Sequence, residues 1–165
     1  MLARLTSLAA SLVLVVPISS GQVTVQSLVN AASYSTDLAP GTWTAIFASP
    51  SQHSARTYIY SVAEQLPTIT RGVKAEGTEA WSGPTTTVMT FQTSDFTVDS
   101  DAAYKTAAAK AGDWLKEPRN AAKPVSLSLG AAQRFPAPVW YILMGTSSDG
   151  FVSLINASTG NVISK

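Results

Sequence analysis

The sequence predicts an α+β protein in which one amphipathic helix packs on one face of an antiparallel β-sheet. Three observations lead to this prediction. Residues 102–115 show a clear helical periodicity, several short segments alternate apolar and polar residues, and turn residues separate those segments. Short strands joined by turns pair antiparallel, and a single helix then covers one face of the sheet.

The first 21 residues have the pattern of a secretory signal peptide. A short basic region ending at Arg4 precedes an apolar run over residues 5–16, and Ser19 and Gly21 suit the −3 and −1 positions of a signal-peptidase site. The apolar run is shorter than the roughly 20 residues that span a bilayer. We therefore expect a secreted or periplasmic chain that begins at Gln22 and has no membrane span after signal cleavage.

Composition divides the remaining chain after residue 55. Residues 22–55 form a segment rich in Ser, Ala and Thr that contains one short predicted strand, Thr42–Phe47. Residues 56–165 alternate strands and turns around the helix, which predicts a single α+β domain. The strands predicted in this domain cover residues 57–62, one or two segments within 68–81, then 85–91, 125–129, 138–144, 151–157 and 162–164. The segment 138–144 is apolar on both faces, so we place it centrally in the sheet.

The predicted helix ends before Pro118. Asp99 or Ser100 supplies the N-cap, and Asp101 adds negative charge to the first turn, where the helix dipole favours it. Steps of 100° per residue define one apolar stripe, made of Ala103, Tyr104, Ala107, Ala108, Ala111, Trp114 and Leu115. We expect this stripe to face the sheet and Trp114 to belong to the core.

Composition excludes several classes of function. Without Arg4 the exported chain carries ten basic and ten acidic residues, so its net charge is near zero. This balance provides no electrostatic attraction for nucleic acid. The chain contains no cysteine, which excludes disulfides, thiolate metal sites and a cysteine nucleophile. We expect no cofactor.

The residues that could carry catalysis form no recognisable set. His53 is the one histidine, and its neighbours in sequence rarely orient as a catalytic triad, so we interpret it as part of a solvated loop. Asp95, Asp99 and Asp101 are the densest acidic cluster, but Tyr104 stands where a calcium loop needs glycine. The sequence therefore predicts neither an enzyme nor a metal site.

Four segments of the C-terminal part form a further pattern. They are the helix at 102–115, the Pro-Val-Trp-Tyr-Ile run at 138–142, the Gly-Phe-Val-Ser-Leu run at 150–154, and residues 155–162. Together they resemble a PepSY-type domain, a small exported bacterial module, and the last segment resembles its V-D-A-x-T-G-x-V hairpin. Asn156 stands where that hairpin usually has an acidic residue, and it can still bond the backbone of its own turn. The resemblance implies a PepSY/cystatin-like fold.

A second similarity lies upstream, in residues 29–47. The runs at 29–34 and 38–42 are similar to the start of immunoglobulin-like modules in exported bacterial proteins. Too little chain precedes Arg56 for a sandwich of about 100 residues. We interpret the similarity as a borrowed leader segment or as chance.

Strand alternation predicts an aromatic binding face. A helix of about 17 residues is near 25 Å long and covers one face of the sheet, which leaves the other face uncovered. The candidate lining of that uncovered face is Tyr58, Tyr60 and one of Trp140 or Tyr141, with Asn156 at its rim. The alternative, given equal weight, is a second, shallower core closed by residues 22–55.

These observations predict an exported, non-catalytic module that binds an unknown protein or peptide, as a monomer or weak oligomer. The resemblance to PepSY-type domains implies that it modulates a protease. The alternative is a carbohydrate- or surface-binding module that uses Trp81, Trp140 and the tyrosines. Glu76 and Glu79, beside Trp81, suit a pair of carboxylates around a sugar, but a solvated strand edge explains them more simply.

The signal-peptide pattern predicts the first residue of the exported chain. Intact mass spectrometry of protein taken from the periplasm or the medium is expected to show a chain that starts at, or within a few residues of, Gln22. A mass that still includes Met1 would contradict the prediction.

Overall fold

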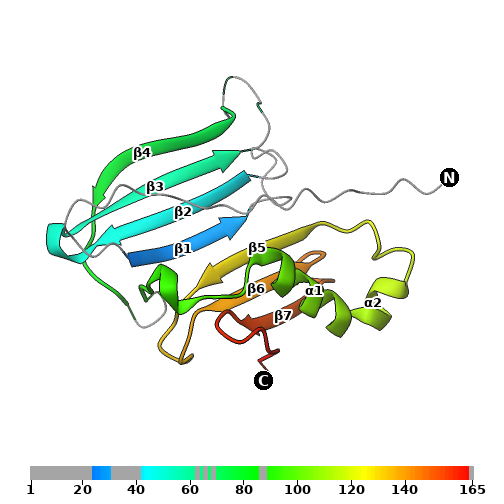
Figure 1. Ribbon diagram of the computed structural model, residues 1–165. Coiled ribbons are helices and arrows are strands. Elements are labelled where there is room, and N and C mark those ends of the chain that lie inside the picture. The colour runs from blue at the N-terminus through cyan, green and yellow to red at the C-terminus, as the bar shows by residue number, and fades with distance from the viewer. Residues whose placement is uncertain are drawn as a thin grey trace.

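The computed structural model describes residues 24–30, 42–61, 64, 67, 70–85 and 89–163 (Figure 1). The predicted signal peptide, Gln22 and the segment 31–41 lie outside these ranges. The described strands are β1 (Thr24–Asn30), β2 (Thr42–Ser49), β3 (Ser54–Ser61), β4 (Gly72–Ala80), β5 (Val125–Gly130), β6 (Val139–Met144) and β7 (Phe151–Asn156). The described helices are α1 (Ser100–Lys110) and α2 (Gly112–Lys116), with 3-10 turns η1 (Pro50–Gln52) and η2 (Thr93–Asp95).

The strands form one antiparallel sheet in the order β4-β3-β2-β1-β5-β6-β7. Two three-stranded halves, β2-β3-β4 and β5-β6-β7, flank β1, which pairs with β2 on one side and with β5 on the other. Helices α1 and α2 lie over the β5-β6-β7 half (Figure 1). The fold is mixed α+β and mostly β, which confirms the predicted class at this coarse level. Within the described ranges, no helix is long and apolar enough to cross a membrane.

The N-terminal segment supplies two strands to this sheet. In the β2–β3 hairpin, Phe47 pairs with Arg56 and Ala48 pairs with Ala55, so a boundary after residue 55 falls inside β3. The prediction of a single short strand in residues 22–55 is wrong, because β1 also forms there. Strand formation depends on the neighbouring strands that a segment meets, and one of the two neighbours of β1, the strand β5, lies in the C-terminal part of the chain.

Helix α1 starts where the sequence predicts. Asp99 is the N-cap, and its Oδ1 accepts a hydrogen bond of 2.7 Å from the backbone N–H of Ala102. The predicted single helix is divided at Ala111, whose φ of −83° and ψ of 7° leave the helical region just before Gly112. The second piece, α2, ends before Glu117, because a residue that precedes proline disfavours helical backbone.

The apolar stripe of the helices buries its small residues rather than its aromatic ones. Ala103, Ala107 and Ala111 are fully buried, which lets the helix lie close to the sheet. Tyr104 is 37% exposed, so its predicted place on the sheet-facing stripe is wrong. Trp114 is half-buried and packs at the margin of the core rather than inside it.

Three strand predictions need correction. In the described part of 162–164, Val162 makes only an isolated bridge, to Ile155, and no strand forms. Residues 85–91 form no strand in their described part, and Met89 makes only a single antiparallel bridge, to Ala131. Because β1 already pairs with β5 as far as Gly130, the chain near Met89 meets β5 just beyond its last residue. Strand β6 pairs on both sides, as expected for the segment 138–144, but it lies second from one end of the sheet rather than at its centre.

The core lies between α1 and the β5-β6-β7 half of the sheet. Its buried members come from the alanine stripe, the sheet face below it and the segment before the helix: Phe91, Ala103, Ala107, Ala111, Leu129, Trp140, Ile142, Met144, Ile155 and Ala157. Trp140 is the largest of them, and its Nε1–H donates a hydrogen bond of 2.8 Å to the carbonyl oxygen of Val98. Its ring also meets the ring of Trp43 edge to face, with centroids 6.3 Å apart. Trp140 therefore joins β6 both to the segment before α1 and to β2.

Trp140→Ala is expected to lower the free energy of unfolding by about 3–5 kcal/mol, the usual cost of deleting a large buried aromatic side chain. Urea unfolding followed by circular dichroism measures this loss. Trp81→Ala is the matched control, since Trp81 is only half-buried and should cost clearly less. A loss below about 1 kcal/mol for Trp140→Ala would contradict the central place given to this residue.

Candidate functional site

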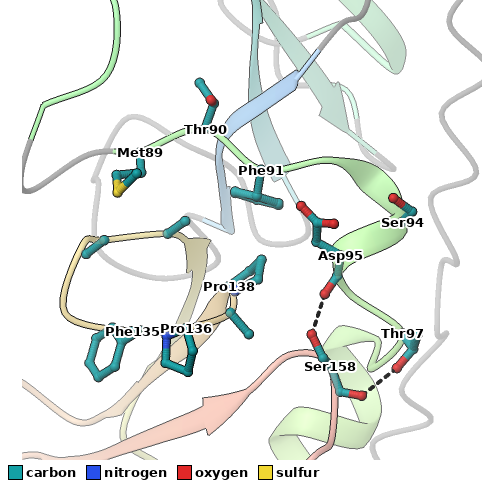
Figure 2. Close-up of a pocket in the computed structure, with 13 residues that line it drawn as sticks. Met89, Thr90, Phe91, Ser94, Asp95, Thr97, Phe135, Pro136, Pro138 and Ser158 are labelled. Carbon is teal, nitrogen blue, oxygen red and sulfur yellow. Dashed lines mark hydrogen bonds between the residues drawn. The ribbon is translucent and has the colours of Figure 1, made fainter.

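A pocket of about 460 Å³ lies where the loop 131–138 joins β5 to β6 (Figure 2). The loop 131–138, the segment 89–97 before α1 and the turn after β7 form its walls. The lining is mostly apolar or hydroxyl-bearing: Met89, Thr90, Phe91, Ser94, Asp95, Thr97, Ala131, Ala132, Phe135, Pro136, Ala137, Pro138 and Ser158. Ser94, Asp95 and Pro136 are exposed, so the pocket opens to solvent.

Hydrogen bonds join the walls to one another. The backbone N–H of Met89 donates to the carbonyl of Ala131 at 3.0 Å, which ties the segment before the helix to the β5–β6 loop. The Thr97 hydroxyl donates to the carbonyl of Ser158 at 2.9 Å, and the Ser158 hydroxyl donates to the carbonyl of Asp95. Both contacts are drawn in Figure 2. The pocket is therefore built from three segments that are far apart in the sequence.

Asn156 positions the turn that carries Ser158. Its Oδ1 accepts hydrogen bonds from the backbone N–H groups of Ser158, at 2.9 Å, and Thr159, at 3.0 Å. This confirms that Asn can bond its own turn in place of an acidic residue. Gly160 completes the turn with a φ of +76°, a conformation that glycine adopts readily. Asn156 thus acts on the pocket through Ser158 and does not line it.

Asp95 supplies a carboxylate to the lining. It is the last residue of η2, and its Oδ2 accepts a hydrogen bond of 2.6 Å from the backbone N–H of Gln92 in a capping box. Its Oδ1 accepts no hydrogen bond from the described part of the chain. The carboxylate is thus anchored by one oxygen and leaves the other available to a ligand.

The structure places the two candidate aromatic residues of β6 on opposite faces of the sheet. Trp140 is 1% exposed on the helix side, so it cannot belong to a binding surface. Tyr141 is 42% exposed on the face away from the helix. Val152 is also 42% exposed, and its partner in the β6–β7 register, Leu143, shares the face of Tyr141. Of the predicted pair, Tyr141 is therefore the residue that projects outward.

Tyr58 and Tyr60 do not share a face with Tyr141. Directly paired residues of neighbouring strands lie on the same face, and one row of pairs runs Trp140, Leu129, Leu28, Ala45, Tyr58 across the sheet. Tyr58 and Tyr60 therefore lie on the helix-side face, over the β2-β3-β4 half. Both are half-buried, and the ring of Tyr58 meets that of Phe47 edge to face with centroids 5.6 Å apart. The predicted set is split between two faces.

The other residues singled out from the sequence lie apart. Of the acidic cluster, Asp95 lies in the pocket, Asp99 caps α1, and Asp101 forms an ion pair of 2.7 Å with Lys105. This pairing raises the pKa of the exposed Lys105. His53 is exposed in a left-handed turn after η1. Within the described ranges, no group of three or more His, Cys, Asp or Glu residues is placed to hold a metal ion.

The two glutamates near Trp81 lie on β4, at one end of the strand order. The side chain of Glu76 forms an ion pair of 3.0 Å with Lys74 on the same strand, and its backbone carbonyl accepts a hydrogen bond from Arg56. Glu79 is exposed, and Glu76 is half-buried. This arrangement is that of a solvated strand edge, the simpler of the two interpretations of these glutamates.

The pocket was not predicted from the sequence. Its apolar lining comes chiefly from the run Ala131-Ala132-Gln133-Arg134-Phe135-Pro136-Ala137-Pro138, which joins two predicted strands. Two prolines and a phenylalanine in such a connection could have indicated a binding site. Prolines stiffen a loop, and an aromatic residue in a surface loop is available to line a pocket. The opposite wall could not be found from sequence, since residues 89–97 approach the loop only in the folded chain.

A separate cluster of charges joins the helical region to the β6–β7 hairpin. The Nζ of Lys123 lies 2.6 Å from Asp149 Oδ2 and 5.5 Å from the centre of the Trp114 ring. The hydrogen bond from Lys123, followed by that from the Thr146 hydroxyl, lowers the pKa of Asp149 from 3.8 to about 2. Gly150 is required in this hairpin, because a Cβ there would lie 2.3 Å from the carbonyl oxygen of Thr146. This cluster is structural and lies outside the pocket.

The lowered pKa predicts an acid-dependent loss of stability. An unfolded chain takes up a proton on Asp149 near pH 4, whereas the folded chain resists protonation until about pH 2. The contribution of Asp149 is therefore complete above about pH 4 and is lost as the pH falls towards 2. Asp149→Asn should lower the urea midpoint at pH 6, and the difference from wild type should vanish near pH 2.

Asp113→Asn is the matched control, because Asp113 forms an exposed ion pair with Lys116 on α2. Exposed pairs contribute little, so its urea midpoint should stay close to that of the wild type across this range. An Asp149→Asn difference that persists unchanged at pH 2 would contradict the assigned cause.

Comparisons of this chain with protein-family models, with curated proteins and with solved structures found no match. The similarity of the helix and of the segments 138–142, 150–154 and 155–162 to a PepSY-type domain therefore stays a prediction.

Proposed function

We propose that the protein is an exported, non-catalytic module that binds a protein or peptide, and that the pocket between the 131–138 loop and the 89–97 segment takes one or two side chains of the partner. The observation that carries this proposal is the pocket itself. Its volume of about 460 Å³ lies in the usual range of ligand sites, roughly 300–1,000 Å³. Its lining combines apolar side chains, which gain affinity by being buried, with hydroxyl and carboxylate groups, which can orient the side chain of a partner.

The form of the pocket favours a segment of a larger partner. Exposed residues at its mouth leave room for a chain to continue beyond the part that is bound. The prolines of the loop limit backbone freedom, so this wall loses little conformational entropy when a ligand binds. Export is supported by the signal-peptide pattern of residues 1–21.

A PepSY-like C-terminal half is part of the proposal. In its support, α1 packs against β6 and β7, and the segment resembling the family hairpin folds back so that Ile155 bridges to Val162. On this basis the partner is a protease or its precursor, whose activity the module modulates. The carbohydrate-binding alternative loses support, because Trp140 is buried and cannot stack on a sugar.

The proposal is tested by selecting peptides from a displayed library against the exported form of the protein. Fluorescence polarisation then measures the affinity of the selected peptides for wild type and for three single variants. Phe135→Ala removes an aromatic wall of the pocket, Tyr141→Ala removes the exposed aromatic of the opposite face, and Tyr58→Ala tests the helix-side aromatic residues. We expect Phe135→Ala to weaken binding at least tenfold and the other two variants to stay within about twofold of wild type.

Circular dichroism confirms that each variant is folded. Loss of binding in Tyr141→Ala or Tyr58→Ala, with Phe135→Ala unaffected, would move the binding surface to that tyrosine and contradict the assigned pocket. Failure to select any binding peptide would contradict the proposed class of partner.

A further inference from the structure

We infer that the pocket prefers a ligand group that joins an apolar body to a positively charged amine. This inference deepens the proposed function and rests on it. The observations that lead to it are the single charge in the described lining and the way in which the hydrogen-bond donors of the walls are already used.

Asp95 is the one charged side chain among the described lining residues. Its Oδ1 accepts no hydrogen bond from the described part of the chain, while Oδ2 is held by the backbone N–H of Gln92. Arg134, the neighbour of Phe135, lies over that ring at 4.7 Å and does not line the pocket. The lining therefore favours a cation over an anion.

Several hydrogen-bond donors in the pocket walls are already bonded to other groups of the protein. The hydroxyls of Thr97 and Ser158 both donate to backbone carbonyls, and the N–H of Ser158 donates to the Asn156 side chain. Pro136 and Pro138 have no N–H group to offer. These bonded groups leave lone pairs rather than protons for a ligand, whereas the hydroxyls of Thr90 and Ser94 can donate as well as accept.

The apolar lining lies around the same hollow. Figure 2 shows Phe91, Pro138 and Met89 around the space that Asp95 also borders. A ligand that fits both features has an aromatic or aliphatic body for these side chains and an ammonium group for the Asp95 carboxylate. The N-terminus of a peptide with an apolar first residue and a lysine side chain both have this chemistry.

The first test compares three small probes that share a phenylethyl body and carry a cationic, a neutral or an anionic head group. Amide chemical shifts of the exported form are followed by nuclear magnetic resonance during titration with 2-phenylethylammonium, 2-phenylethanol and 3-phenylpropionate. We expect the cation to shift the amides of Phe91, Asp95 and Phe135 with the tightest binding, and the anion with the weakest. The advantage of the cation over the alcohol should decrease as salt is raised.

Asp95→Asn isolates the charge. Asparagine can still accept the hydrogen bond from Gln92, so the capping box and the pocket wall are retained. We expect this variant to bind the cation about three- to tenfold more weakly, to a level near that of the alcohol. Asp113→Asn is the matched control, since it removes the same charge outside the pocket and should leave binding of all three probes unchanged.

The two sources of the amine are separated with short peptides. Phe-Ala-amide presents a charged N-terminus, whereas acetyl-Phe-Lys-amide presents only a lysine side chain, and binding of either one in an Asp95-dependent manner supports the inference. Equal binding of the cation and the alcohol to wild type would overturn the charge preference and leave the pocket as a binding site. If none of the probes and peptides shifts the lining amides, the inference and the assigned pocket both fail.

Discussion

The buried indole of Trp140 is the contact on which the arrangement of the molecule depends. Its N–H bonds the carbonyl of Val98, and this fixes the chain just before α1 against the sheet. The N–H of Val98 in turn donates to the carbonyl of Ala157, so the same residue is held from the end of β7. Through its edge-to-face contact with Trp43, the indole also touches β2, in the other half of the sheet.

Close packing of α1 follows from small side chains on both surfaces. Three buried alanines face the sheet, and Ser153 of β7 is also buried, with a hydroxyl that has no hydrogen-bond partner among the described residues. An unpaired buried hydroxyl costs free energy. A larger apolar side chain at this position would hold the helix away from the sheet, so the small size of Ser153 is consistent with the close approach.

The same contacts also hold the walls of the pocket in place. Trp140 and Val98 fix the chain on one side, and the turn held by Asn156 brings Ser158 next to Asp95 and Thr97. The loop 131–138 then closes the space from the other side, with its prolines limiting how far it can relax. The hydrogen bonds that assemble these walls also use the hydroxyl protons of Thr97 and Ser158, so these two groups offer a ligand only lone pairs.

Features that depend on neighbours along the chain could be predicted from the sequence. Short-range geometry explains the cap at Asp99, the helix end before Pro118, the turn at Asn156 and the strands at 125–129, 138–144 and 151–157, and the structure confirms them. The strand predicted at 162–164 is not among them, because Val162 makes only an isolated bridge. Which faces of the strands and helices meet depends on long-range pairing and could not be predicted. Alternation sorts the residues of one strand into two sets, but pairing across β1 decides that Tyr58 shares a face with Trp140 and not with Tyr141. The pocket could likewise not be predicted from the sequence, because contacts between residues more than 60 positions apart, such as that of Thr97 with Ser158, bring its walls together.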